Sequence, residues 1–178
     1  MQALLIIDIQ NDYFPGGRAE LVNPEAALAN AKKLLHYFRG NKLPVIHVQH
    51  INTREGASFF LPNTSGANIH EQLKPLENEY LVVKNYPNSF YGTDLCNILN
   101  KNITELVVCG MMTHMCIDTT VRAAKDYEIP VTLIYDACAT KDLTFNEITV
   151  PAEQVQAAFM ASLSGMFAQI TAADDYIG

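Results

Sequence analysis

Six short runs of apolar and often β-branched residues recur along the chain and predict β-strands. The first run is apolar almost throughout, which is typical of a strand buried on both faces of a parallel sheet. Four further runs read the same way, and the last of the six is weaker. The predicted strands are Ala3–Ile9, Pro44–His50, Tyr80–Lys84, Glu105–Cys109, Val131–Tyr135 and Met166–Thr171.

Between these runs, apolar residues repeat at intervals of three and four, as they do on amphipathic helices. The clearest helix begins with Asn23 as its N-cap and Pro24 at its first position, and Gly40 is expected to end it. Two further helices are predicted over Thr93–Asn100 and Met115–Tyr127. Pro151 opens the last predicted helix, whose apolar stripe comprises Val155, Phe159, Leu163 and Met166.

Strands that alternate with helices predict parallel pairing through right-handed crossovers, and therefore an α/β fold with three layers, an α/β/α sandwich. The sequence contains no repeat, low-complexity tract or linker, so residues 1–178 are expected to form a single domain. Two stretches, Asn52–Glu79 and Ala139–Val150, are rich in loop-forming residues. Loops of this length in a compact domain usually cover a site or contact another subunit.

Composition and charge narrow the expected partners. Hydrophobic residues make up 49% of the chain, charged residues make up 17%, and the formal net charge is −7. The Lys and Arg residues are scattered, which argues against nucleic acid or an anionic membrane as the main partner. The N-terminal apolar run is short, is interrupted by Asp8 and follows no basic segment, so neither a signal peptide nor a membrane span is expected. A cytoplasmic protein is the resulting prediction.

Ligands of an open parallel sheet bind beyond the carboxyl ends of its strands. Cys116 stands out among the polar residues there because it begins the helix that follows a predicted strand. The positive end of that helix and its free N–H groups favour a thiolate and can bind an oxyanion. Position alone leaves open whether Cys116 is a nucleophile or a packing residue. The candidates at this edge are Asp8, His47, His50, Lys84, Thr113, His114, Cys116 and Asp136.

Two charged residues end otherwise apolar runs at the same edge. A carboxylate such as Asp8 is costly there unless it is paired or catalytic, although it could also cap a loop. Lys84 could equally be a surface lysine that leaves its strand. Together with Cys116 they are more informative, because a cation lowers the pKa of a nearby thiol and a carboxylate can take its proton and return it to a leaving amine.

The chain contains three long motifs: LLIIDIQNDY at 4–13, VVKNYPNSFYGTDL at 82–95 and VVCGMMTHMCIDTTVRAAKD at 107–126. These motifs, with weaker support from YDACAT at 135–140, resemble those of the isochorismatase-like cysteine hydrolases. This superfamily includes nicotinamidases, N-carbamoylsarcosine amidohydrolase and ureidoacrylate amidohydrolase, and the resemblance covers nearly the whole chain. It implies a Rossmann-like, six-stranded parallel sheet in the order 3-2-1-4-5-6, and assembly as a homodimer or homotetramer.

The resemblance also implies a catalytic triad of Cys116, Asp8 and Lys84. It further implies a cis peptide bond before Met112, with the N–H groups of Met112 and Cys116 forming an oxyanion hole. Asp8 would deprotonate Cys116, the thiolate would attack a carbonyl carbon, and water would hydrolyse the resulting thioester. Isochorismatases proper lack the nucleophilic cysteine, so vinyl-ether hydrolysis is not the favoured reaction.

Several further residues are expected around the substrate. Tyr13 takes the place of a family aromatic that covers the substrate, and Gln10 is expected to support the site through hydrogen bonds from behind it. His114 is the best candidate for direct contact, although a structural role fits it equally well. Phe59 and Phe60 could cover the mouth or reach a neighbouring subunit. The predicted substrate-binding residues are Tyr13, His47, Phe90, Tyr91, Thr113 and His114.

No metal or other cofactor is expected. Nicotinamidases carry an Asp-x-His metal motif after the second strand, and here Gln49 falls about where that Asp would be. A neutral amide is a poor replacement for a carboxylate ligand. His47 and His50 are three residues apart on a predicted strand, which places them on opposite faces.

The predicted function is a metal-independent amidohydrolase that cleaves a C–N bond of a small amide, ureido or carbamoyl compound. Nicotinamidase activity is the alternative within the enzyme class, and a catalytically idle protein that binds a small ligand is the alternative outside it. Serine-hydrolase, P-loop and dinucleotide-binding patterns are absent from the sequence. The remaining cysteines, Cys96, Cys109 and Cys138, are interpreted as packing residues.

Overall fold

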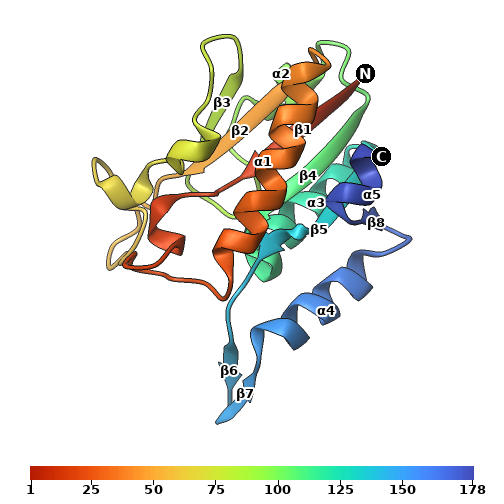
Figure 1. The fold of residues 1–178 in the computed structure, drawn as a ribbon. Coiled ribbons are helices and arrows are strands. Elements are labelled where there is room, and N and C mark those ends of the chain that lie inside the picture. The colour runs from red at the N-terminus through yellow and green to blue at the C-terminus, as the bar shows by residue number, and fades with distance from the viewer.

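A computed structural model describes residues 1–178 and places six parallel strands in one sheet (Figure 1). The spatial order β3-β2-β1-β4-β5-β8 confirms the predicted order, since β8 is the sixth strand of this sheet along the chain. The strands are β1 (Gln2–Ile7), β2 (Val45–His50), β3 (Tyr80–Lys84), β4 (Glu105–Met111), β5 (Val131–Ala139) and β8 (Gln169–Thr171).

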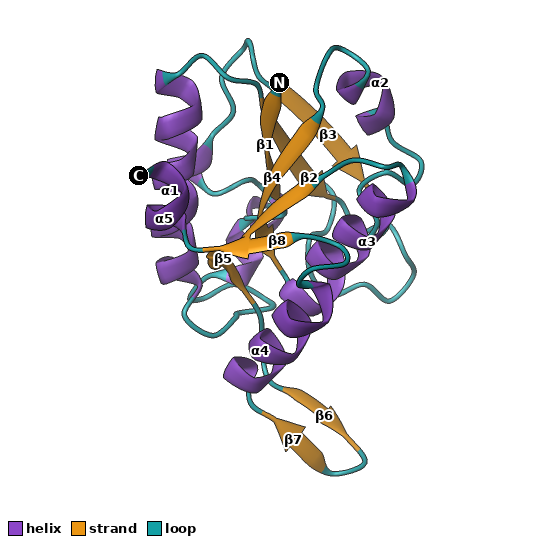
Figure 2. Cartoon of the chain, turned by 90° about the vertical axis from the view of Figure 1, so that its right-hand side faces the viewer, coloured by secondary structure: helices purple, strands orange, loops and turns teal.

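Helices cover both faces of the sheet, which confirms the three-layer prediction (Figure 2). One face packs against α1 (Pro24–Gly40) and α5 (Ala173–Ile177), and the other against α2 (Leu95–Leu99), α3 (Asp118–Asp126) and α4 (Ala152–Leu163). No helix of the structure has the length and hydropathy needed to cross a bilayer. Short 3-10 helices span Asn11–Tyr13, Ser65–Ala67 and Glu71–Leu73, and a π-helical turn spans Thr113–Ile117.

The central strand β1 is buried on both faces, which explains its nearly continuous apolar sequence. Leu4 and Ile6 belong to the core beneath α1, whereas Leu5 and Ile7 belong to the core on the opposite side. Burying such side chains stabilises the fold by about 1.5–3 kcal/mol each. The carboxyl end of β1 is therefore held firmly between its neighbours β2 and β4.

Several boundaries differ from the predicted ones. β1 ends at Ile7 because Asp8 adopts a left-handed conformation with φ 52° and leaves the strand. The helix predicted to begin at Met115 starts instead with the π-helical turn, and α3 follows it. The prediction for Met166 is wrong: it lies beyond the end of α4 and is 69% exposed, while Met160 is buried in its place. The C-terminal helix α5 was not predicted.

The second predicted loop contains regular structure. Its residues form an antiparallel hairpin of β6 (Leu143–Phe145) and β7 (Ile148–Val150), which projects from the body of the molecule (Figures 1 and 2). Asn146 and Glu147 turn the hairpin with φ values of 47° and 65°, the backbone that a two-residue type I′ turn requires. The other predicted loop, between β2 and β3, is confirmed as a long connection with two 3-10 turns.

Gly110 lets β4 pass close to β1. Its φ is 136°, a backbone conformation that residues with a Cβ rarely adopt. An added Cβ would also overlap the backbone of Ile7. Gly40 offers a matched comparison, because it is the last residue of α1 and an added Cβ there would meet no atom within 4 Å.

We expect Gly110→Ala to lower the free energy of unfolding by about 2–4 kcal/mol, because the strand must shift or remain strained. Gly40→Ala should leave stability unchanged or raise it by about 0.5–1 kcal/mol, as alanine favours the helix. Urea denaturation of both variants measures the difference. Equal stability of the two variants would contradict this account of Gly110.

Candidate active site

Three separate segments bring Asp8, Lys84 and Cys116 together at one edge of the sheet. Asp8 follows β1, Lys84 is the last residue of β3, and Cys116 lies in the π-helical turn after β4. The strands are parallel, so their carboxyl ends meet at this edge. The intervening strand β2 ends in His50, which stands in register with Lys84.

The Lys84 ammonium group is the centre of the cluster. Its Nζ lies 2.7 Å from Oδ2 of Asp8, 3.1 Å from Nδ1 of His50 and 3.2 Å from Sγ of Cys116. It also donates to the carbonyl oxygen of Tyr86 at 3.1 Å. The side chain is almost wholly removed from solvent. A buried ammonium is stable only when acceptors replace its water shell, and here four acceptors surround three N–H groups.

These contacts decide the charge of the lysine and the histidine. Burial opposes the charge of Lys84, but Asp8 and Cys116 outweigh it and raise the pKa of the ammonium. Burial and the neighbouring Lys84 lower the pKa of His50 to about 4. Lys84 is therefore charged and His50 neutral at neutral pH. Because Nδ1 of His50 accepts from the ammonium, its proton is on Nε2.

The thiol of Cys116 differs from the sequence-based expectation. Burial raises its pKa, Asp8 raises it further, and the opposing effect of Lys84 is too small to compensate. The prediction that the pKa of the Cys116 thiol is lowered is therefore wrong. It considered the positive charge of Lys84, but neither the negative charge of Asp8 nor the loss of solvent around the thiol. In the resting site Cys116 is a neutral thiol.

Asp8 is placed to accept the proton of that thiol. Apart from its ion pair with Lys84, its carboxylate oxygens have no hydrogen-bond partner, although the side chain is fully buried. A carboxylate oxygen of Asp8 and the sulfur of Cys116 lie within 4.8 Å of each other. Proton transfer from sulfur to Asp8 would exchange one anion for another beside the same ammonium. The net charge of the site would not change.

The same cluster has the spacing of a metal site but is filled by the ammonium. The ligand atoms of Asp8, His50 and Cys116 all lie within 4.8 Å of one another, and Lys84 Nζ contacts each of them. A metal ion would have to displace this cation. The residues present therefore suit an ammonium better than a metal.

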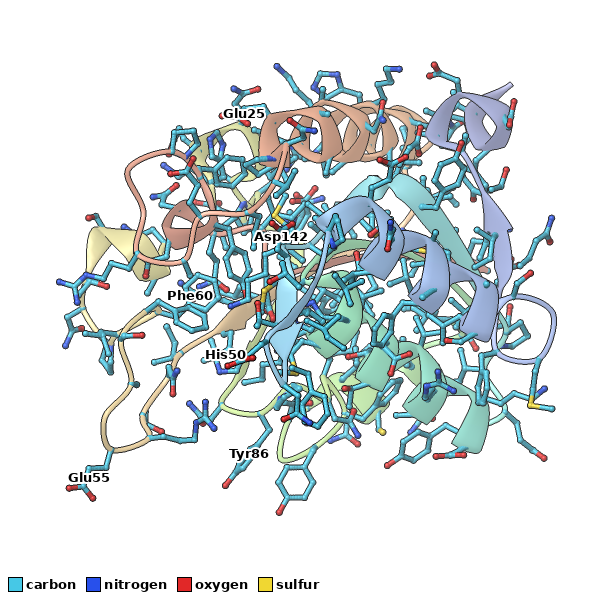
Figure 3. All side chains as sticks on the ribbon, turned by 90° about the horizontal axis from the view of Figure 1, so that it is seen from below. Glu25, His50, Glu55, Phe60, Tyr86 and Asp142 are labelled. Carbon is cyan, nitrogen blue, oxygen red and sulfur yellow. The ribbon has the colours of Figure 1, made fainter.

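A cavity of about 450 Å³ lies over Cys116. Five parts of the chain form its wall: the turn after β1, the end of β2 with the connection that follows it, the segment after β3, the turn after β4, and the base of the β6–β7 hairpin. Figure 3 views the molecule from this end; His50 and Phe60 point inward there, whereas Glu55 lies at the periphery. The lining residues are Tyr13, His50, Asn52, Arg54, Phe59, Asn85, Tyr86, Pro87, Met112, His114, Met115, Cys116, Lys141 and Leu143.

Three predicted site residues besides Cys116 line this cavity. Burial, with Cys116 and Asp8, raises the pKa of Tyr13, so its phenol stays protonated. Nδ1 of His114 lies 2.6 Å from the hydroxyl of Thr140, which leaves Nε2 free. The N–H of Met112 donates no hydrogen bond within the protein, and the peptide bond before it is cis, as the resemblance implies.

Two predicted substrate-binding residues point elsewhere. His47 lies on the opposite face of the sheet from His50, as the strand alternation predicts, and its Nε2 lies 2.9 Å from Oε2 of Glu79. Phe90 packs in the core with its ring stacked on Tyr127 at 4.9 Å. The prediction that these two residues border the pocket is wrong, because nearness in sequence to a strand end does not decide which face a side chain takes.

Tyr91 and Thr113 also lie outside the cavity wall. Tyr91 is 61% exposed and its ring pairs with that of Tyr86 at 4.8 Å. Thr113 is fully buried, with its hydroxyl 3.3 Å from the carbonyl oxygen of Ala139 and 2.5 Å from the amide oxygen of Gln156. Its hydroxyl therefore ties the turn after β4 to β5 and α4 and is not available to a substrate.

Sequence reasoning did not identify several wall residues. The alternation on β2 separated His50 from His47, but the prediction assigned His47 to the substrate, whereas His50 lines the cavity. Asn52, Arg54 and Lys141 belong to long connections, where no periodic pattern indicates the direction of a side chain. Tertiary structure alone places them over Cys116.

Two buried polar side chains hold the wall from behind. The amide of Gln10 accepts from the N–H of His50 at 2.7 Å and donates to its carbonyl at 2.9 Å. The carboxylate of Asp12 accepts from the N–H of Phe60 at 2.7 Å and from that of Arg18 at 3.3 Å. Phe60 in turn packs against Tyr13, with ring centroids 4.6 Å apart. Asp12 therefore positions the segment that covers the cavity.

Comparison with known proteins shows the family to which the chain belongs. The isochorismatase domain model matches residues 2–175, so the chain belongs to the isochorismatase family of hydrolases. The isochorismatase family protein YddQ of Bacillus subtilis (strain 168) is 52% identical over 176 residues, which cover 98% of each chain. A solved structure from Oleispira antarctica, assigned to the isochorismatase hydrolases, is 50% identical with a TM-score of 0.96, covering 99% of this chain and 95% of that one.

A more distant relative carries a specific name. A streptothricin hydrolase of Streptomyces noursei is 34% identical over 146 residues, which are 80% of this chain and 51% of that protein. The chain spans about half the length of this relative.

We expect Asp12→Ala to lower the free energy of unfolding by about 1–3 kcal/mol, because it leaves the N–H of Phe60 buried without an acceptor. The same change should raise KM by loosening the cavity cover. Asp126→Ala, at an exposed position of α3, should change stability by less than about 0.5 kcal/mol. Urea denaturation compares the two variants, and equal losses would show that Asp12 has no special role.

The raised thiol pKa makes a second prediction about Asp8. In Asp8→Asn the repelling carboxylate is gone while Lys84 remains, so the pKa of Cys116 should fall and its alkylation by iodoacetamide at pH 7 should accelerate, by about tenfold for each unit of decrease. Lys84→Met should slow the alkylation. Peptide mass spectrometry separates Cys116 from the half-buried Cys96. Slower labelling of Asp8→Asn than of the wild type would overturn this assignment of charges.

Proposed function

We propose that the chain is a cysteine hydrolase that cleaves a C–N bond of a small amide, ureido or carbamoyl compound through a thioester on Cys116. One observation carries this proposal: a buried ammonium touches both a carboxylate without other partners and a thiol, at the base of a cavity. Such a group provides a nucleophile, its base and a fixed counter-charge.

In the first step the substrate carbonyl lies over the sulfur of Cys116. Asp8 takes the thiol proton while Lys84 stays beside the thiolate and offsets its charge. The sulfur then attacks the carbonyl carbon, and the electron pair of the C=O bond moves to oxygen. The N–H groups of Met112 and Cys116 would hold this oxyanion, an interaction worth about 3–4 kcal/mol for one donor in other hydrolases.

In the second step the tetrahedral intermediate collapses. The C–N bond breaks, the protonated Asp8 returns its proton to the leaving nitrogen, and ammonia or an amine departs. Asp8 then takes a proton from a water molecule, whose oxygen attacks the thioester carbonyl. Cys116 leaves as a thiolate and regains its proton, so the products are a carboxylic or carbamic acid and the original thiol.

Membership of the isochorismatase family supports hydrolysis, and one relative in it is named a streptothricin hydrolase. Nicotinamidase activity has less support, because His47 faces away from the cavity and Gln49 donates to the carbonyl of Ala67 at 2.8 Å. An idle binding protein has less support as well. Burying the ion pair of Lys84 and Asp8 costs free energy, and a protein that only binds a ligand would gain nothing from that cost.

We expect wild-type protein, screened against small amides, ureido acids and carbamoyl compounds, to release ammonia that Cys116→Ala does not release. Asp8→Asn should lower kcat by about 10²–10⁴, the range for loss of a general base. Cys96→Ala is the matched control and should keep full activity, because Cys96 lies on α2 away from the cavity. Mass spectrometry of quenched turnover should find the acyl group on Cys116. If no compound separates wild type from Cys116→Ala, the proposal fails.

A further inference from the structure

We propose that the substrate carries a carboxylate in addition to its scissile amide, and that Arg54 and Lys141 bind this carboxylate. The identity of the scissile bond rests on the proposed function above. The anion site itself rests on the wall of the cavity and can be tested without turnover.

The charge of the cavity wall is opposite to that of the whole protein. The chain carries 19 acidic and 12 basic residues, yet the 14 residues that line the cavity include Arg54 and Lys141 and no Asp or Glu. The two cations come from different parts of the chain, one from the connection after β2 and the other from the segment before the β6–β7 hairpin. Their convergence on one cavity is a property of the fold.

The acids that follow these cations in sequence do not neutralise them. Glu55 points away from the cavity to the periphery of the molecule (Figure 3). Oδ1 of Asp142 accepts from the N–H of Ala152 at 2.7 Å, at the start of α4. Neither Arg54 nor Lys141 forms an ion pair within the chain. Both charges are therefore available to a ligand.

The guanidinium of Arg54 is also oriented in part. Its Nε lies 3.5 Å from Oδ1 of Asn52, while its two terminal nitrogens bond to nothing in the protein. Such a free pair of N–H donors matches the two oxygens of a carboxylate. Lys141 adds a second, flexible cation at the same cavity. Both residues are exposed, so a neutral or cationic substrate would leave the two charges to water alone.

The positive charges of Arg54 and Lys141 help to lower the pKa values of two histidines in the cavity wall. Arg54 contributes to the lowered pKa of His50, after burial and Lys84, and Lys141 contributes to the lowered pKa of His114, after burial. Both rings are therefore neutral at pH 7 and add no further charge. The positive potential near the mouth comes from Arg54 and Lys141, whereas at the base Lys84 is balanced by Asp8.

These features define a substrate class. A carbonyl over Cys116 and a carboxylate at Arg54 and Lys141 describe a small acid with an amide or ureido group at its other end. A cavity of about 450 Å³ is large enough for such a molecule and lies within the range of small-ligand sites.

The test compares matched pairs of compounds that differ only in the distal group: malonamate with malonamide, succinamate with succinamide, and glutaramate with glutaramide. For at least one pair we expect kcat/KM to favour the acid by tenfold or more. Arg54→Met and Lys141→Met should each raise KM for that acid by about tenfold, the effect of losing about 1.4 kcal/mol of binding, with kcat changed less than about threefold and the diamide unaffected. Lys125→Met is the control, because Lys125 is exposed on α3 and lies away from the cavity.

A second measurement needs no turnover. Malonate, succinate and glutarate should protect Cys116 from iodoacetamide in the wild type, their diamides should protect less, and both Met variants should lose the difference. Protection of this kind without ammonia release from any amide would support the anion site and overturn only the hydrolytic proposal. Equal turnover of acids and diamides, or protection that is unchanged in both variants, would overturn the anion site and leave the hydrolase intact.

Discussion

The structure of the site depends on one buried ammonium group. Removing a lysine ammonium from water costs several kcal/mol unless charge and hydrogen-bond acceptors compensate for it. Lys84 obtains these acceptors from Asp8 after β1, His50 at the end of β2, Cys116 after β4 and the nearby carbonyl of Tyr86. Three strand ends and one turn must therefore hold their positions together. The same contacts that stabilise the charge assemble the proposed chemistry.

Asp8 and Cys116 can each carry a negative charge, but both contact the same cation, Lys84. This explains why Cys116 is a neutral thiol before a substrate binds. With Asp8 ionised, a second charge on Cys116 would be buried without a partner, so the pKa of the thiol is raised. A proton can instead move between sulfur and carboxylate with the ammonium unchanged. We infer that the nucleophile forms only as the proton transfers. This limits wasteful reaction of the sulfur with other electrophiles, since a neutral thiol is far less reactive than a thiolate.

The cavity wall shows how strongly function depends on the connections. The two strand histidines have opposite roles, because the alternation of a β-strand sends His50 to the site and His47 to Glu79 beneath α1. The proposed anion site comes wholly from irregular segments, where Arg54 and Lys141 lie far apart in sequence. Such segments follow no period, so their side-chain directions depend on hydrogen bonds made across the fold, such as that of Asp12 with Phe60.

The sequence by itself determined the alternating strands and helices, and hence the layered α/β fold. A helix or strand that is buried on one or both faces has apolar residues at a regular spacing along the chain. The motifs of the sequence, through family resemblance, supplied the strand order and the grouping of Asp8, Lys84 and Cys116. Only the tertiary structure decided that the thiol pKa rises, that Phe90 and Thr113 turn away, and that a hairpin lies beside the site. Desolvation, the distance between charges and the orientation of loop side chains arise from contacts between residues remote in sequence. The local spacing of apolar and polar residues carries no information about such contacts.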